Sequence, residues 1–365
     1  MRLETEGKFC AVFLAHPGHN EKAHKTTRGI FDMTHRNKGT WLLTALCAFA
    51  LLPFRARALS TGDLLTPVGR AVAIELETEG VIVAGLAQVE TEEGERSPAG
   101  EAGLQPGDRI TAVNGCPVRS GEDFLRTLEE CGGEQIVLTA CRDGRERDFP
   151  VEAVRGSDGE RYLGLWLRSS ISGIGTVTFQ DPLSGVYGAL GHGVCMENEQ
   201  TLTPVSGGSI APASIGSVVR GEKGSPGELV GAPVSGEALG SVERNTDSGI
   251  FGTAQPLGGG ALPTAAEEEI RPGAATILSN VQGETVEEYG VEIVRVTPDA
   301  PDGRQLALKV TDERLLGLTG GIVQGMSGSP IIQNGKLVGA VTHVLVEDPT
   351  RGYGVCIDRM LSAAA

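Results

Sequence analysis

The chain has 365 residues, of which 53 are glycine and only 4% are aromatic, and its formal net charge is −16. This composition argues against a helical bundle or coiled coil and favours a turn-rich β protein. Residues 1–59 carry nine basic and four acidic side chains, so the remainder is strongly acidic. Because an acidic body without a basic stripe repels phosphate backbones, we expect no nucleic-acid partner.

The amino-terminal region has the features of an export signal. The apolar run at residues 41–52 is too short to span a bilayer as a helix, follows a basic segment, and precedes the small-residue pattern Ala56-Arg57-Ala58. We therefore expect an extension and basic region at 1–40, then a signal peptide or short membrane anchor at 41–58. A signal of ordinary length would begin at Met33, so residues 1–32 are interpreted as a misassigned start.

A linker at residues 59–66 is expected to precede a first domain at 66–155. Residues 98–115 read PAGEAGLQPGDRITAVNG, in which successive turns flank a short strand and end in an Asn-Gly hairpin signal. A helix beginning after Ser120 and a hairpin turning at Asp143-Gly144 follow.

This arrangement resembles a PDZ domain. PDZ domains bind an extended peptide as an added strand and capture its terminal carboxylate with backbone amides. The resemblance places that carboxylate loop at Gly69, Arg70, Ala71 and Val72 and implies peptide termini as partners.

From residue 160 to 365, short apolar runs alternate with glycine-rich turns, which favours an antiparallel barrel or sandwich. The sharpest motif is residues 325–330, GMSGSP, placed before a hairpin with an Asn-Gly turn. Glycines beside Ser327 let a substrate approach, and they permit a turn that aims the amides of Gly325 and Ser327 at one point. These residues therefore suit a nucleophile and an oxyanion hole, in the pattern of chymotrypsin-like serine proteases.

A serine nucleophile needs a base. Beyond residue 59 the chain has two histidines, His192 and His343. His192 ends an apolar strand between glycines and is the candidate base, whereas His343 lies in mid-strand and is interpreted as a histidine of the sheet. Asp312 is a candidate for the group that orients the base, and Asp247 or Glu243 would serve nearly as well.

Several stretches resemble the signalling serine peptidases of family S55, the stage IV sporulation protein B family of endospore-forming bacteria. They are residues 187–192 (YGALGH), 223–228 (KGSPGE), 245–252 (NTDSGIFG), 319–336 (TGGIVQGMSGSPIIQNGK) and 339–344 (GAVTHV). The resemblance covers most of the chain after residue 60. It implies a PDZ domain followed by a chymotrypsin-like (trypsin-type) β-barrel peptidase domain at 160–365. It also implies Ser327 as nucleophile, His192 as general base and Asp312 as the orienting acid.

The family's role is implied in the same way. Its members are exported across the inner forespore membrane into the intermembrane space and cleave themselves. They then cleave a membrane-bound regulator of an intramembrane protease complex, which activates the late mother-cell sigma factor. The expected self-cleavage zone here is residues 59–67.

Two other functions remain open: a quality-control protease of the HtrA type and a non-catalytic PDZ scaffold. HtrA-type proteases usually place the PDZ domain after the protease, whereas here it comes first. No cofactor or metal is expected. The seven cysteines form no C-x-x-C pair, and His192 and Cys195 lack a second ligand pair.

Overall fold

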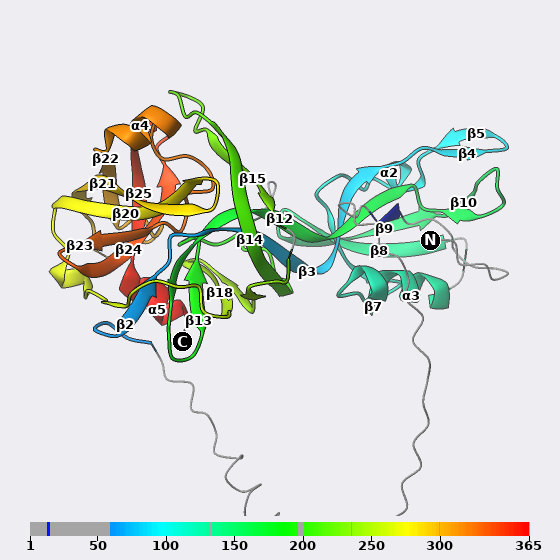
Figure 1. Ribbon diagram of the computed structural model, residues 1–365. Helices are drawn as coiled ribbons and strands as arrows, with labels where there is room; N and C mark the ends of the chain where they lie inside the picture. The colour runs from blue at the N-terminus through cyan, green and yellow to red at the C-terminus, as the bar shows by residue number, and fades with distance from the viewer. Residues whose placement is uncertain are drawn as a thin grey trace, which may run out of the picture.

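The computed structural model describes residues 59–364, except 132, 134, 196–200, 235 and 299, together with the two-residue strand β1 (Phe13–Leu14). The predicted extension at 1–40 and signal segment at 41–58 otherwise lie outside the described residues. Strands dominate and are gathered into two parts joined by long ribbons (Figure 1). The mainly β fold, with a PDZ domain ahead of a barrel, is therefore confirmed.

The PDZ part is a small sheet flanked by a helix. Its elements, besides the end of β3, are β4 (Val89–Thr91), β5 (Gly94–Arg96), α2 (Pro98–Glu101), β6 (Arg109–Val113), β7 (Cys116–Pro117), α3 (Gly121–Cys131), β8 (Gln135–Arg142) and β9 (Arg145–Glu152). The predicted turns at Asn114-Gly115 and Asp143-Gly144 have positive φ at both residues, as a type I′ hairpin requires. Ser120 accepts a hydrogen bond from the Asp123 amide at 3.1 Å and begins α3.

One long strand runs through both parts of the molecule. β3 (Ala71–Leu86) pairs along its length with β12 (Leu165–Gln180), and near its end it also pairs with β6 of the PDZ part. Its first half also pairs with β14 (Val205–Val219). The PDZ and peptidase parts therefore share a continuous hydrogen-bonded sheet (Figure 1).

The residues before β3 belong to the peptidase part. Leu64–Pro67 form β2, which pairs with β12 and with β19 (Leu262–Pro263), and Leu65 is fully buried. The predicted linker at 59–66 thus ends in a strand, and the predicted self-cleavage zone overlaps folded backbone.

The predicted carboxylate loop at Gly69, Arg70, Ala71 and Val72 is wrong. The Gly69 amide donates to Val177 O at 2.9 Å, and the Arg70 carbonyl accepts from the Val177 amide at 3.0 Å. Ala71 and Val72 are fully buried against the peptidase core. These backbone groups are bonded to β12, so they cannot receive a peptide terminus.

The peptidase part contains two groups of strands. The first, with β2, β3 and β12, comprises β13 (Val186–Ala189), β14, β15 (Glu228–Pro233), β16 (Gly240–Ser241), β17 (Arg244–Thr246), β18 (Gly249–Thr253) and β19. The second is a closed antiparallel barrel of β20 (Gly273–Gln282), β21 (Thr285–Val296), β22 (Leu306–Val310), β23 (Pro330–Gln333), β24 (Lys336–Val344) and β25 (Arg351–Cys356). A small hairpin of β10 (Val154–Arg155) and β11 (Arg161–Tyr162) precedes them.

Short helices complete this part: η1 (Glu267–Glu269), α4 (Glu313–Thr319) and α5 (Ile357–Ala364). The amphipathic α5 buries Met360 and Leu361 against Leu65, Phe179 and neighbouring residues. The carboxyl-terminal helix thereby fastens the first group of strands to the barrel.

Candidate active site

A cavity of about 700 Å³ lies between the two groups of strands of the peptidase part. Both histidines of the body, His192 and His343, line it, together with Gly325, Ser327 and Thr342. Most of the remaining lining is aliphatic and comes from β3, β12 and the segment before Ser327. The structure thus brings the predicted nucleophile and the predicted base into one cavity.

The Ser327 turn depends on its glycines. Gly325 has φ +95° and Gly328 has φ +97°, a region that side chains other than glycine rarely adopt. A Cβ on Gly328 would lie 2.0 Å from Thr176 O, so no larger residue fits there. The turn therefore packs directly onto the backbone of β12.

The amides expected to form an oxyanion hole have no acceptor among the described residues. The carbonyl of Gln324 accepts from the Leu229 amide at 2.9 Å, and that of Met326 accepts from the Ser329 amide at 3.0 Å. In a trans peptide the N–H points away from the carbonyl, so the following amides, of Gly325 and Ser327, point the opposite way. Neither amide donates a hydrogen bond within the described part of the chain. Two free donors beside a serine hydroxyl are what a developing oxyanion requires.

The Ser327 hydroxyl donates to Thr342 O at 2.7 Å. No hydrogen bond joins it to the His192 ring among the described residues. For attack on a substrate, the Ser327 side chain would have to rotate from this carbonyl toward the imidazole. Hydrogen bonds between catalytic groups often form fully only when substrate is bound.

His192 lies at a sharp corner that follows β13. Leu190 and Gly191 have φ of +68° and +71°, and positive φ at a leucine is a strained conformation. The His192 Nδ1 lies 2.9 Å from Gly193 O, so a neutral ring carries its proton on Nδ1 and leaves Nε2 free to accept one. Burial lowers the pKa of His192, and the bond to Gly193 offsets this only in part. The ring is therefore neutral, and able to act as a base, at neutral pH.

Asn245 holds the segment that follows His192. Its Oδ1 accepts from the Val194 amide at 2.9 Å, while its Nδ2 donates to Val194 O at 2.8 Å and to Thr203 O at 3.0 Å. Through these three bonds one side chain connects Val194 to Thr203.

His343 was interpreted from sequence as a histidine of the sheet, but its ring lies beside the base. The ring centroids of His343 and His192 are 5.0 Å apart, at an interplanar angle of 38°. Burial, and then the neighbouring His192, lower the pKa of His343 to about 4. The hairpin turn alone could not have found it: the turn pairs Gln333 with Lys336, a register that would put position 342 opposite Ser327. A bulge between Ile331 and Ile332 shifts the pairing to Pro330 with Ala340 and so brings His343 to the site.

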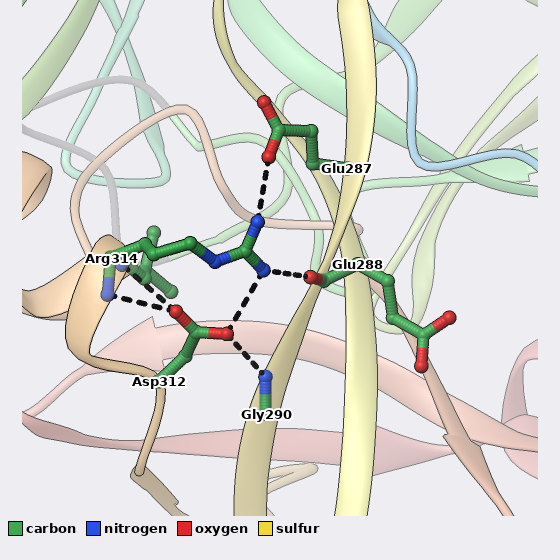
Figure 2. Close-up of polar contacts among 6 residues, drawn as sticks. Glu287, Glu288, Gly290, Asp312 and Arg314 are labelled. Atoms are coloured by element: carbon green, nitrogen blue, oxygen red, sulfur yellow. Dashed lines mark hydrogen bonds and ion pairs between the residues drawn. The ribbon is translucent and has the colours of Figure 1, made fainter.

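Asp312 is not brought to His192. It is the N-cap of α4, where its carboxylate accepts from the amides of Arg314 at 2.9 Å and Leu315 at 3.3 Å (Figure 2). It also accepts from the Gly290 amide at 3.3 Å and from the Arg314 guanidinium at 3.1 Å. It does not line the cavity. Burial acts to raise the pKa of Asp312, but these hydrogen bonds, led by the one from Arg314, outweigh it and lower the pKa.

The other candidate carboxylates are also engaged elsewhere or exposed. Glu243 accepts from the hydroxyls of Ser241 at 3.4 Å and Thr253 at 3.2 Å. Asp247 is exposed in the turn between β17 and β18. The Gly193 carbonyl, rather than a carboxylate, is therefore the group bonded to the His192 Nδ1 in this structure.

One group of potential metal ligands is found within the described residues, at Glu267, Cys356 and Asp358. None of the three lines the cavity. Burial raises the pKa of the Cys356 thiol, which disfavours the thiolate that a metal would bind. Within the same residues, no helix combines the length and the apolar character needed to cross a bilayer.

Curated relatives share short stretches with this chain. A putative zinc metalloprotease of Treponema pallidum is 33% identical over 24% of this chain and 20% of its own length. Zinc metalloprotease RasP of Shouchella clausii is 36% identical over 26% of this chain and 22% of its own. A putative zinc metalloprotease of Agrobacterium fabrum is 26% identical over 61% and 56%. The chain spans about a fifth of the length of the first two and just over half of the third.

Family models match both parts of the molecule. A PDZ domain model matches residues 91–142. The model of the SpoIVB peptidase S55 family matches residues 159–361, which contain Ser327, His192 and the whole closed barrel. This match covers more than half of the chain and agrees with the resemblance found in the sequence, so the chain belongs to the SpoIVB peptidase S55 family of serine peptidases.

Proposed function

We propose that this protein is a signalling endopeptidase in which Ser327 is the nucleophile and His192 is the general base. The observation that supports this most is the shared cavity, where the serine, the imidazole and two unbonded amides converge. Gly325 and Ser327 are partly exposed where they line the cavity, so their unbonded amides are accessible to a substrate carbonyl.

The reaction would proceed by acyl transfer. The Ser327 hydroxyl turns from Thr342 O toward His192 Nε2 and attacks the scissile carbonyl as the imidazole takes its proton. The amides of Gly325 and Ser327 stabilise the oxyanion, and each such donor is worth about 3 kcal/mol. The imidazolium then protonates the leaving amine, and water hydrolyses the acyl-enzyme by the same sequence.

The orienting group for His192 differs between the sequence and the structure. Resemblance assigns the role to Asp312, whereas the geometry gives the Nδ1 proton to the Gly193 carbonyl. A carbonyl can select the tautomer, although it stabilises the imidazolium less than a carboxylate does. We propose a Ser–His pair with this carbonyl as the working arrangement, and Asp312 stays an untested prediction as a third member.

The biological role we propose is that of the family: export to the space between the forespore membranes, self-cleavage, and cleavage of a membrane-bound regulator that leads to sigma-factor activation. Family membership and the domain order support it. In the described structure residues 64–67 form a strand in which only Leu64 is exposed, so self-cleavage in the predicted zone fits best before the strand, near the exposed Ser60 and Thr61.

Amino-terminal sequencing of wild-type and Ser327→Ala protein, expressed in parallel, tests this proposal. We expect a shortened amino terminus in the wild type and an unprocessed one, or one cut only at the signal, in the variant. Identical termini would contradict self-cleavage, and degradation of unfolded casein by the wild type would favour quality control instead.

A further inference from the structure

Thr176 of β12 joins the two halves of the proposed site. It is fully buried. Its amide donates to Ser327 O at 3.0 Å, and its carbonyl accepts from the Leu190 amide at 3.1 Å, two residues before His192. A single residue thus bonds to both the serine turn and the histidine corner.

The side chain of Thr176 makes a third bond. Its Oγ1 donates to Gly325 O at 2.9 Å. On the other side of the Gly325 Cα, the Gln324 carbonyl is held by the Leu229 amide at 2.9 Å. Both peptide planes that flank Gly325 are therefore fixed by hydrogen bonds, although glycine itself imposes little restriction on φ.

We infer that Thr176 is a positioning residue of the oxyanion hole. Its hydroxyl holds the Gly325–Met326 peptide, which lies between the two peptides that carry the Gly325 and Ser327 N–H groups, and so keeps these two donors aligned with one another. Without the bond, rotation about the ψ of Gly325 would change the angle between the two donor peptides, so the pair of amides would be preorganised less well and would stabilise the transition state less. This inference rests on the proposed function of Ser327 and assigns a role to a residue of the opposite strand group.

Thr178 provides a matched control on the same strand. It is also fully buried, but its Oγ1 has no hydrogen-bond partner. Replacing Thr178 by valine removes a buried hydroxyl that bonds to nothing, whereas the same replacement at Thr176 removes the bond to Gly325. Both variants replace a buried hydroxyl by a methyl group, but only Thr176→Val loses a hydrogen bond.

The test is the rate at which a fluorescent fluorophosphonate labels the full chain. We expect Thr176→Val to be labelled about tenfold more slowly than wild type, from the loss of a buried hydrogen bond that orients an oxyanion donor. We expect Thr178→Val to be labelled at the wild-type rate and Thr176→Ser, which keeps the hydroxyl, to recover most of the lost rate.

Two further measurements separate positioning from general loosening. Circular dichroism identifies a temperature at which every variant is folded, and the labelling rates are compared at that temperature. The acidic limb of the labelling rate against pH should be unchanged in Thr176→Val, because His192 sets it. If the valine variant does not fold, Thr176→Cys replaces it and should be slower than Thr176→Ser.

The labelling results distinguish failure of this inference from failure of the proposed function. Labelling of the wild type that is lost in Ser327→Ala, with a fall of about fivefold or more in Thr176→Val, supports the inference. A smaller fall, or an equal fall in Thr178→Val, overturns it while leaving the nucleophile in place. No labelling of the wild type would instead overturn the proposed function.

Discussion

Replacing Asp312 by asparagine distinguishes a helix cap from a catalytic carboxylate. Asparagine is as good an N-cap as aspartate, so its side-chain oxygen can still accept from the amides of Arg314 and Leu315. The variant loses the ion pair with Arg314, whose side chain is 59% exposed, and also the 3.3 Å bond from Gly290, because an amide nitrogen replaces the oxygen that accepts both. Because the Arg314 side chain is largely solvated and the Gly290 bond is long, the free energy of unfolding should fall by only about 1–2 kcal/mol.

The effect on catalysis is where the two roles differ. An acid that orients the histidine costs about 10⁴-fold when changed to its amide, because the wrong tautomer is favoured. The observed geometry, with Nδ1 bonded to Gly193 O, predicts that fluorophosphonate labelling of Asp312→Asn stays within about tenfold of wild type. Urea unfolding of the same samples measures the stability change.

Asp312→Ala is the companion variant. It removes the cap and should lose about 1 kcal/mol more than the asparagine variant, with little further change in labelling below its unfolding temperature. A thousandfold or greater fall in the labelling of folded Asp312→Asn would refute the reasoning. It would show that the carboxylate reaches the imidazole in another conformation.

Three further predictions concern other parts of the chain. The folded protein holds the pKa of His343 at about 4, below the ordinary value of 6.5. As the pH falls, the unfolded chain therefore binds the proton first. The free energy of unfolding that is fully present above pH 6.5 decreases as the pH falls toward 4. His343→Gln should reduce this decrease by about 2 kcal/mol in urea titrations. An unchanged decline would contradict the burial of a neutral ring. Gly325→Ala forces an alanine to φ +95° and puts its Cβ 3.0 Å from a buried leucine side chain, so labelling should fall at least about a hundredfold; near-normal labelling would exclude this oxyanion hole. Arg142 bonds the almost fully buried Asp108 at 2.6 and 2.5 Å, so Arg142→Ala should destabilise the PDZ part by about 3 kcal/mol in hydrogen exchange, whereas a loss below about 1 kcal/mol would show that water replaces the pair.

Local signals in the sequence predicted the local structure well. The Asn-Gly and Asp-Gly turns, the start of α3 after Ser120 and the glycine-bounded turn at Ser327 all appear as expected. Each depends on backbone preferences within a few residues, which composition and spacing report directly. The prediction that Ser327 and His192 belong to one site followed from the scarcity of histidines, and the two residues do line one cavity.

Features set by long-range pairing could not be read in the same way. The register of β3 against β12 joins positions about a hundred residues apart, so nothing local showed that residues 69–72 pack in the peptidase core. Asp312 lies only fifteen residues before Ser327 in the chain, but its carboxylate caps α4 and does not line the cavity that holds Ser327. His343 was missed because a single histidine in an apolar strand carries no pattern of its own, and the bulge that brings it opposite Ser327 has no signal in the sequence.

Mass spectrometry of the fluorophosphonate-treated protein tests the central claim most directly. The account predicts one covalent adduct, on the tryptic peptide that contains Ser327, with its rate of formation collapsing in His192→Ala and the adduct missing from Ser327→Ala. An adduct on another serine, or unchanged labelling without the His192 imidazole, would contradict it.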